Sequence, residues 1–431
     1  MCSAKSIMKI AAAFITVILF FLTTSCAGSG TGNNLVIEKE DEGRVVNMFS
    51  PMEKTEANVD NVARSATDKT VIMAEEKLGI SVGYITYTAE DHKDKTYDDV
   101  ALDRARSDMD DIYLMNPDTI QKLGEEGKLM DLSGLSCAEN LRDVVKTANM
   151  IDGKLVAIPQ EVVAYGLFIN KDMFDQLGLN LPETPEEFLE CCRVFKENGI
   201  ETPVGANRWW LETFVLAQAY ADLYNGGGAE AEIAALNKGE SKYSDYMRPG
   251  FEFLQEMIDQ GYIDTQKAYV SEAIEGEGED FLAQKTPIVM AYWGAANAET
   301  AYGNPDFEML VIGFPSSRGQ MPVVAMTGFG VGVNAKHRDD AMAALDVMLQ
   351  VYAETNKVIS PSKNVEVECI PALKPLNDRI EENVYVLGAN ASMKMEQWGN
   401  ICLVVRELLN GAAVDECMAE FDRLQAESIE K

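Results

Sequence analysis

Apolar residues follow two different spacings along the first part of this chain. Short segments at 45–50, 80–88 and 111–115, which alternate or run apolar, are typical of strands. Between and after them, at 59–78, 97–106 and 117–126, apolar residues recur every three or four positions, as in amphipathic helices. Strands that alternate with helices in this way predict a parallel sheet with helices on both faces.

A second kind of segment follows at 151–174, with the sequence IDGKLVAIPQEVVAYGLFINKDMF. Asp152 and Gly153 suit a tight hairpin turn, and Pro159 excludes a central strand or a helix interior at its position. Residues 162–169 are almost all apolar, which predicts a strand buried on both faces. Two interpretations are open: a core strand of one domain, or a strand that passes from one lobe into another.

The remainder of the chain is rich in helical patterns. The clearest helix start is Thr184-Pro185, where Thr184 is a good N-cap and proline suits the first helical position. Further helices are expected at 212–224, 249–260, 339–352, 396–409 and 414–425, and strands at 287–292, 309–314, 323–333 and 365–370. The acidic segment 275–280 is expected to be a loop. Because 431 residues exceed one typical hydrophobic core, two lobes are expected.

Charge and composition narrow the classes of partner. The chain is 47% hydrophobic and 25% charged, with a net charge of −33. Such an acidic surface repels nucleic acid and anionic lipid headgroups, so neither is expected as a partner. The excess acid is interpreted as a solvated surface, and a cationic ligand is the less favoured alternative.

The N-terminal residues indicate an exported protein. Lys5 and Lys9 precede an apolar segment, 10–22, which is too short to span a bilayer and suits a secretory signal. Small residues before Cys26 resemble the cleavage site of a bacterial lipoprotein. This resemblance implies a signal peptide at 1–25, lipidation at Cys26 and a flexible tether at 26–43 that holds the protein on the outer side of the cell membrane. The alternative is an ordinary secretory signal in which Cys26 has no role.

Cysteine and histidine usage gives no sign of a metal or cofactor site. The chain has eight cysteines and two histidines, and their spacing matches no known metal-ligand pattern. The acidic segment 275–280 lacks EF-hand spacing, and no Lys-Ser/Thr follows the glycines at 226–228 as in a phosphate-binding loop. The six cysteines other than Cys2 and Cys26 are expected to be small buried residues with free thiols.

Six segments, in this order, resemble the extracellular solute-binding proteins of ABC importers, specifically the maltose-binding-like family 1. They are GKLMDLSGL, the segment 151–174 from its GKLVAIP onward, LPETPEEF, FLAQKTPIVMAYWG, TGFGVGVNAKHRDDA and RELLNGAAVDECMAEFDRL. The resemblance implies two α/β lobes that are joined by crossing strands and enclose a ligand between them. It places the crossings at 162–169, 309–314 and 360–370. The first lobe would contain 44–164 plus 312–360, and the second 165–311 plus 361–431.

The candidate site residues follow from the chemistry of sugars, which present flat C–H faces and a ring of hydroxyl groups. By the resemblance, Trp398 begins a ligand-facing helix, and Asn207, Trp209 and Trp210 form a ligand loop. Trp293 lies in a strand-end motif, although a few residues before the family's usual position. Residues at predicted strand ends, at a turn and at the first crossing complete the set: Ser50, Glu53, Met115, Asn116, Asp118, Gly328 and Glu161. Each tryptophan could instead pack in a core, and each acid could be a helix cap or a solvated group.

The resemblance implies a binding protein without catalytic activity that delivers a sugar or oligosaccharide to a membrane permease. A carrier of polyamines or other cations, using Glu53, Asp118 or Glu161, is the main alternative. A secreted glycoside hydrolase is a third possibility, but no pair of carboxylates is marked by the sequence. A fourth is a sensor that presents its ligand to a histidine kinase.

Overall fold

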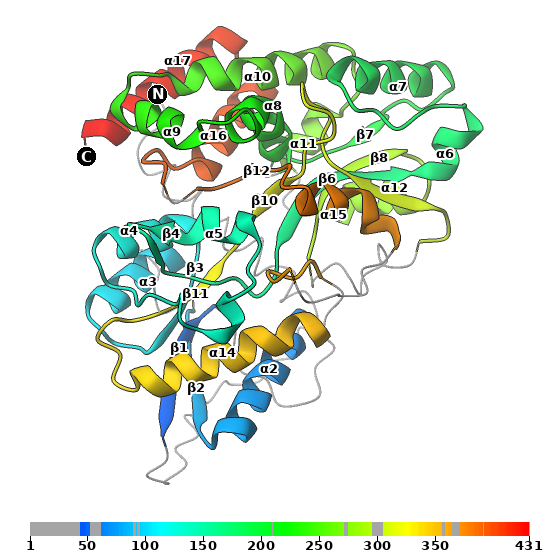
Figure 1. Cartoon of the computed structure of the whole chain (residues 1–431). Helices are drawn as coiled ribbons and strands as arrows, with labels where there is room; N and C mark the ends of the chain where they lie inside the picture. Colours follow the sequence, from blue (N-terminus) through cyan, green and yellow to red (C-terminus); the bar gives the residue numbers. More distant parts are fainter. Residues whose placement is uncertain are drawn as a thin grey trace.

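The computed structural model describes residues 44–51, 62–88, 92, 95–208, 210–270, 275–294, 305–355, 358–363, 371–390 and 392–430. The predicted signal peptide, the tether, Cys26, Glu53 and Trp209 lie outside these residues. The described residues form two lobes, each a sheet with helices packed on it, as predicted (Figure 1). No helix in the described part is long and apolar enough to cross a membrane.

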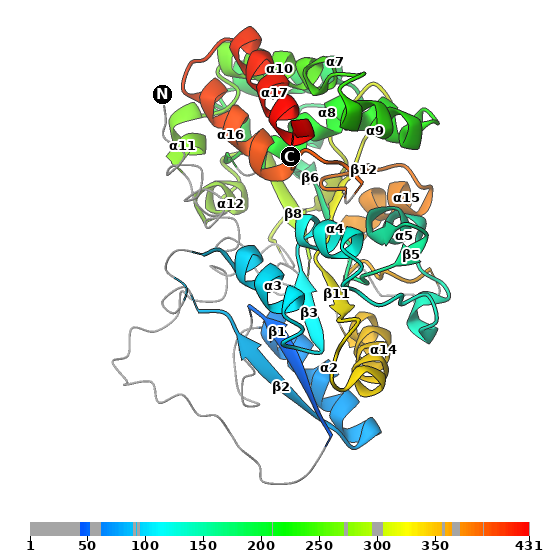
Figure 2. The same ribbon diagram turned by 90° about the vertical axis from the view of Figure 1, so that its left-hand side faces the viewer.

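The first lobe contains a four-stranded sheet in the order β11-β3-β1-β2. Strands β1 (Val45–Ser50), β2 (Ser81–Thr86) and β3 (Ile112–Met115) are parallel, and β11 (Gly328–Val331) is antiparallel to β3. Around the sheet lie α2 (Val62–Leu78), α3 (Tyr97–Arg106), α4 (Pro117–Glu125), α5 (Asp143–Asn149) and α14 (Arg338–Thr355). Helices α2 and α14 pack against each other although they are far apart in the sequence (Figure 2). The predicted parallel sheet is therefore confirmed.

The second lobe contains a six-stranded sheet built around β6 (Val163–Asn170). Its order is β12-β10-β6-β8-β7, and β9 also pairs with β6. The other strands are β7 (Val204–Gly205), β8 (Ile288–Trp293), β9 (Met309–Ile312), β10 (Val323–Ala325) and β12 (Val386–Leu387). The described helices of this lobe are α6 (Lys171–Gln176), α7 (Pro185–Glu197), α8 (Leu211–Asn225), α9 (Ala229–Lys238), α10 (Tyr243–Asp259), α11 (Thr265–Val270), α12 (Glu275–Leu282), α15 (Lys374–Glu381), α16 (Trp398–Leu409) and α17 (Val414–Glu430). A small hairpin, β4 (Met150–Ile151) and β5 (Lys154–Leu155), carries the predicted Asp152-Gly153 turn, with both residues at positive φ.

The chain leaves the first lobe just before β6. Ile158 still bridges Phe329 in the first lobe, Val162 bridges Ile359, and β6 then enters the second sheet. The chain passes between the lobes once more after Ser362. Ser362 bridges Leu141 in the first lobe, whereas residues 371–373 pack on β9 in the second. Residues 364–370 of the predicted crossing lie outside the described part of the chain.

The second crossing differs from the predicted 309–314. Strand β9 pairs with β6 from Leu167 to Asn170, so the chain is still in the second lobe at Ile312. Strand β10 also pairs with β6, and the first-lobe strand β11 begins at Gly328. The return therefore lies between Ala325 and Gly328. Strands β9, β10 and β11 are similar short apolar runs, and their partners, rather than their composition, decide the sheet to which each belongs.

Two predicted elements are also corrected. The segment at 275–280 belongs to α12, whose Phe281 is buried, so these acids lie on a helix and not in a loop. Helix α10 begins at Tyr243, and Pro249 lies inside it. By contrast, α7 starts as predicted: the Thr184 hydroxyl accepts the Glu187 backbone N–H, and the Glu187 carboxylate accepts the Thr184 backbone N–H.

The cysteines of the described residues have free thiols, as predicted. Cys191, Cys192, Cys402 and Cys417 are buried, and Cys137 is partly buried. Burial raises the pKa of Cys191 and of Cys417 to about 11, so both are uncharged thiols at neutral pH. No group of three or more metal-ligating side chains occurs in the part of the chain that the structure describes.

Candidate ligand-binding site between the lobes

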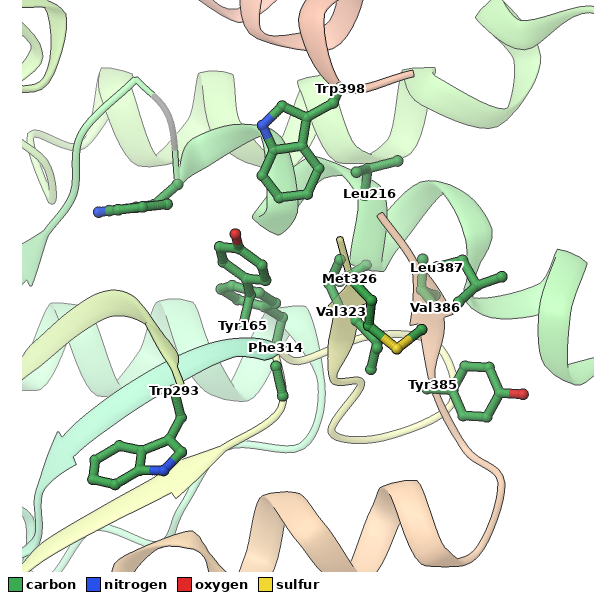
Figure 3. Close-up of a cluster of buried hydrophobic side chains, with 14 of the residues drawn as sticks. Tyr165, Leu216, Trp293, Phe314, Val323, Met326, Tyr385, Val386, Leu387 and Trp398 are labelled. Atoms are coloured by element: carbon green, nitrogen blue, oxygen red, sulfur yellow. The ribbon is translucent and has the colours of Figure 1, made fainter. Parts of the chain in front are cut away.

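Four aromatic side chains form a continuous cluster in the second lobe: Tyr165, Trp210, Tyr292 and Trp398, here called the aromatic cluster. The Tyr165 ring centroid lies 5.1 Å from that of Trp398, 5.7 Å from that of Trp210 and 5.6 Å from that of Tyr292. Trp210 and Tyr292 are 5.4 Å apart. Tyr165 and Trp398 point toward each other in Figure 3. Such tilted ring pairs stabilise one another by about 0.5–1.5 kcal/mol beyond the area that they bury.

Each ring comes from the end of a regular element. Tyr165 is near the start of β6 and is the cross-strand partner of Tyr292 near the end of β8. Trp210 immediately precedes α8, and Trp398 is the first residue of α16. Gly388 makes room for Trp398, because a Cβ at Gly388 would lie 2.6 Å from the Trp398 ring. Rings held at element ends keep a defined orientation without being enclosed by a helix bundle.

The aromatic cluster lies toward the first lobe. Tyr165 follows the first crossing closely, and Tyr292 lies near Glu161, which is part of that crossing. Trp398 is two residues from Glu396, whose carboxyl lies close to Asp118 of the first lobe. Tyr292 is partly exposed, whereas Tyr165, Trp210 and Trp398 are 4–8% exposed. The Trp210 indole Nε1 is buried and has no hydrogen-bond partner among the described residues.

Trp293, a predicted stacking residue, does not belong to this cluster. It is fully buried, and its ring centroid lies 6.3 Å from that of Phe168. Successive side chains of a strand point to opposite faces, so Tyr292 in the cluster directs Trp293 to the other side of the sheet (Figure 3). Trp293 is therefore buried on the face of the sheet away from the aromatic cluster, and Tyr292 is the residue of this strand that belongs to the cluster.

Asn207 has a structural role at the start of α8. It is buried, and its Oδ1 accepts the backbone N–H of Trp210 at 3.1 Å. This bond holds the turn that presents the Trp210 ring to Tyr165. Asn207 and Trp210 are thus brought together as predicted, with Asn207 fixing the position of the aromatic ring.

The first lobe contributes a group of polar side chains near the start of α4. The Asn116 amide donates to both carboxylate oxygens of Asp98 at 3.1 Å, and the Thr119 hydroxyl donates to Asp98 at 2.9 Å. The carboxyl of Asp118, in the first turn of α4, lies close to that of Glu396 in the second lobe. Asp118 therefore lies near Glu396 of the other lobe, and Asn116 is hydrogen-bonded to Asp98 within the first lobe.

Burial dominates the electrostatics of these acids. It raises the pKa of Asp118 from its ordinary 3.8 to about 8, and the neighbouring Glu396 carboxyl adds to the rise. Burial also raises the pKa of Asp98, although the hydrogen bonds from Asn116 and Thr119 oppose the change. Protonated Asp118 can donate a hydrogen bond, a role that its ordinary carboxylate form cannot fill.

Glu161 lies between the lobes. It is partly exposed, and its negative charge contributes to raising the pKa of Tyr292 in the second lobe and of Tyr352 in the first. Its Oε2 is 3.5 Å from the position that a Cβ would occupy on Gly294. Glu161 is therefore placed where a ligand held between the lobes could meet it.

Three predicted first-lobe residues are packed inside that lobe. Met115 and Ser50 are fully buried, and Gly328 is the strand partner of Met115. A Cβ at Gly328 would lie 2.9 Å from the Ala157 Cβ, so glycine there permits close packing. These three residues therefore contribute to the packing of the first lobe.

The aromatic residues Tyr165, Tyr292 and Tyr87 were absent from the predicted set. Tyr87 follows β2, is partly exposed, and stacks on His92 with ring centroids 5.5 Å apart. Tyr165 lies within the apolar run 162–169, and the composition of that run indicated only a buried strand. The alternation of side chains between the two faces of a strand was the signal that could have shown which face Tyr165 occupies.

Glu212 lies behind the aromatic cluster and is fully buried. Burial raises its pKa well above the ordinary carboxyl value of 4.5, and the thiol of Cys402 is a polar neighbour. The fold therefore favours the protonated form of Glu212 up to a higher pH than the unfolded chain does. The contribution of Glu212 to stability is fully present below pH 4.5 and falls by up to about 1.4 kcal/mol per pH unit above it, until the folded pKa is passed.

Glu212→Gln is therefore expected to raise the melting temperature at pH 8 relative to wild type more than it does at pH 5. Thermal unfolding at both pH values measures this difference. Glu125→Gln, an exposed acid on α4, is the control and is expected to change the two melting temperatures equally. An equal effect of Glu212→Gln at both pH values would contradict the protonated state.

The family model described as bacterial extracellular solute-binding protein matches residues 61–351, and the chain belongs to this family. The predicted family resemblance is thereby confirmed. The sequence also matches a multiple sugar-binding protein of Streptococcus mutans, with 27% identity over 110 residues; the match covers 25% of this chain and 26% of that protein.

Solved structures share the two-lobe fold. A family 1 extracellular solute-binding protein from Bifidobacterium longum subsp. infantis superimposes with a TM-score of 0.69 at 18% identity, over 89% of this chain and 100% of that chain. Apo RafE from Streptococcus pneumoniae gives 0.68 at 14% identity, over 90% and 99% of the two chains. RafE in complex with raffinose gives 0.66 at 16% identity, over 89% and 99%. At these identities the likeness concerns the fold.

Proposed function

We propose that this protein binds a sugar or oligosaccharide between its lobes and delivers it to the membrane permease of an ABC importer. The observation that carries the proposal is the aromatic cluster at the face of the second lobe toward the first. Aromatic rings are suited to the apolar C–H faces of a pyranose, and a set of four held at element ends provides such a surface.

Polar groups for the sugar hydroxyls come from the opposite side. Asp118 and Glu161 are near the lobe boundary, Asn116 is two residues from Asp118, and together they supply both donors and acceptors. A hydroxyl group both donates and accepts, so a mixed set of amide, protonated carboxyl and carboxylate is well matched to it. The sugar in the RafE complex and the name of the Streptococcus mutans relative favour the same ligand class.

Binding in this arrangement would be coupled to the position of the lobes. A ligand that contacts both lobes stabilises the closed arrangement by its difference in affinity for the closed and open forms. The closed form would then be the one that the permease recognises. Lipid attachment at Cys26 would keep the protein at the outer side of the membrane, and loss of palmitate labelling in Cys26→Ser would support that attachment.

A panel of mono- and oligosaccharides and polyamines tests the ligand class. We expect a sugar to raise the melting temperature of purified residues 27–431 and to be recovered unchanged. Stabilisation by polyamines alone would overturn the sugar proposal. Release of a hydrolysed product would contradict a pure binding function.

A cationic solute is the second candidate, and one observation favours it. Asp98, Asp118, Glu161 and Glu396 lie near the lobe boundary. An ammonium group would gain from such acids. Burial, however, favours the protonated form of Asp98 and Asp118, which reduces the negative charge available to a cation.

A further inference from the structure

A second group of aromatic rings lies in the first lobe and is here called the ring row: Phe49, Tyr97, Tyr87 and His92. Phe49 stacks on Tyr97 with ring centroids 5.1 Å apart, and Tyr97 meets Tyr87 edge to face at 5.7 Å. Tyr87 in turn stacks on His92 at 5.5 Å, with the two ring planes 11° apart. Phe49 and Tyr97 are buried, whereas Tyr87 and His92 are partly exposed. The ring row therefore runs from the core of the first lobe to its surface and ends in two rings that a ligand can reach.

Hydrogen bonds hold the outer part of the ring row in place. The Tyr87 backbone N–H donates to the Ser50 carbonyl at 3.3 Å, and the Tyr87 hydroxyl donates to the Lys95 carbonyl at 2.9 Å. The Tyr97 hydroxyl donates to the Leu114 carbonyl of β3. Rings that are already oriented lose little conformational freedom when a ligand packs on them, which favours binding.

The ring row lies at the edge of the first sheet that faces the second lobe. Strands β1, β2 and β3 are parallel, so their carboxyl ends share one edge, where ligands of such sheets bind. Met115, at that end of β3, pairs with Gly328, where the chain has just returned from the second lobe. Tyr87 directly follows the carboxyl end of β2. Tyr87 and the His92 ring stacked on it therefore lie on the side of the first lobe toward the second.

The exposed rings are separated from the polar groups of α4 along this edge. Strand β3, which precedes Asn116, and strand β2, which precedes Tyr87, lie on either side of β1. Neighbouring strands are about 4.8 Å apart, so the ends of β3 and β2 are separated by about 10 Å. A ligand that uses both places must extend along the edge of the sheet, as an oligosaccharide does.

We propose that Tyr87 and His92 form a second stacking surface, which takes a further sugar unit of an oligosaccharide bound between the lobes. This inference rests on the proposed function, because it assigns the pair to the same ligand. The rings meet the apolar C–H face of that unit. The neutral imidazole of His92 has one donor and one acceptor nitrogen for its hydroxyl groups. The ligand class is thereby narrowed to sugars of more than one unit.

The chain has two histidines, which makes a spectroscopic test direct. His337 is the internal control, because its backbone N–H donates to Asp111 at 2.9 Å and Asp111 precedes β3, at the opposite edge of the sheet. Nuclear magnetic resonance of residues 27–431 with isotope-labelled histidine gives one imidazole signal for each, and His92→Gln assigns them. The saccharide panel includes glucose, maltose, raffinose and maltotetraose as a series of increasing length. An oligosaccharide that raises the melting temperature is expected to shift the His92 signal and to leave the His337 signal unchanged.

Isothermal titration of His92→Ala gives the size of the contribution. We expect about a two- to tenfold loss of affinity for the longest saccharide that binds wild type, and unchanged affinity for the shortest. Trp398→Ala is the comparison and is expected to weaken both.

Three results would overturn the second stacking surface while leaving sugar binding itself intact. They are an unchanged His92 signal with a bound oligosaccharide, equal affinity of His92→Ala and wild type for every saccharide, and stabilisation by monosaccharides alone. If no saccharide of the panel raises the melting temperature, the proposed function and this inference fall together.

Discussion

Trp398→Ala is expected to weaken ligand binding by at least about tenfold, which corresponds to about 1.4 kcal/mol. The indole is in contact distance of Tyr165 at the face of the second lobe toward the first, and its ring would stack on the ligand. Alanine removes that surface. It also removes the ring that packs on Tyr165 at a centroid distance of 5.1 Å. Isothermal titration with the sugar that gives the largest thermal shift measures the loss.

The side chain of Trp398 is 7% exposed, so its removal also leaves a cavity. Trp398→Phe separates the two effects because it keeps an aromatic ring and fills more of the space. We expect its affinity to lie between those of wild type and Trp398→Ala. Trp293→Phe, on the other face of the sheet, alters a buried tryptophan and is expected to leave affinity unchanged. Unaltered affinity of a folded Trp398→Ala would exclude a stacking role.

The first lobe could be predicted from sequence because its elements are local. Strands and helices alternate, and each strand meets its partner through a helix that packs back on the sheet. The capped start at Thr184 is equally local, since Thr184 and Glu187 satisfy each other's backbone groups within one turn. Such features depend on residues only a few positions apart, so the order of residues in the sequence is enough to predict them.

The second crossing could not be predicted in the same way. Residues 309–312 and 328–331 are both short apolar runs, but the first pairs with β6 and the second with β3. Which partner each chooses depends on the positions of strands that are distant in the sequence. The family resemblance implied two lobes but placed the return at 309–314, before β10, which still pairs with β6.

The candidate site residues also divide into those with a local sequence signal and those that depend on distant parts of the chain. Trp210 and Trp398 could be predicted because aromatic residues at helix starts rarely serve the interior of a helix bundle. The choice between Tyr292 and Trp293 required the pleat of β8 and its register with β6, in which Tyr165 faces Tyr292. The contact of Asp118 with Glu396 has no local signature, since the two residues come together through the relative placement of the lobes.

Gly166→Ala is expected to be among the most destabilising single substitutions in the second lobe. Gly166 lies in β6, and a Cβ there would be 2.1 Å from the backbone oxygen of Ile312 in β9 and 3.2 Å from Leu376 Cδ1. Backbone atoms of a paired strand cannot rotate away as a side chain can, so β9 would have to separate from β6. We expect a cost at or above the upper end of the range of about 1–3 kcal/mol for overpacking in a core.

Gly134→Ala is the matched control, because a Cβ at Gly134 would meet no atom within 4 Å. Its effect is expected to be neutral or stabilising by about 0.4–1 kcal/mol through the unfolded chain. Urea unfolding of both variants gives the two free energies of unfolding.

A Gly166→Ala protein as stable as Gly134→Ala would show that β9 can shift freely. In that case the close approach of β9 to β6, and the position of the second crossing that depends on it, would have to be reconsidered. Loss of stability confined to Gly166→Ala would instead support the central place of β6, from which Tyr165 projects into the aromatic cluster.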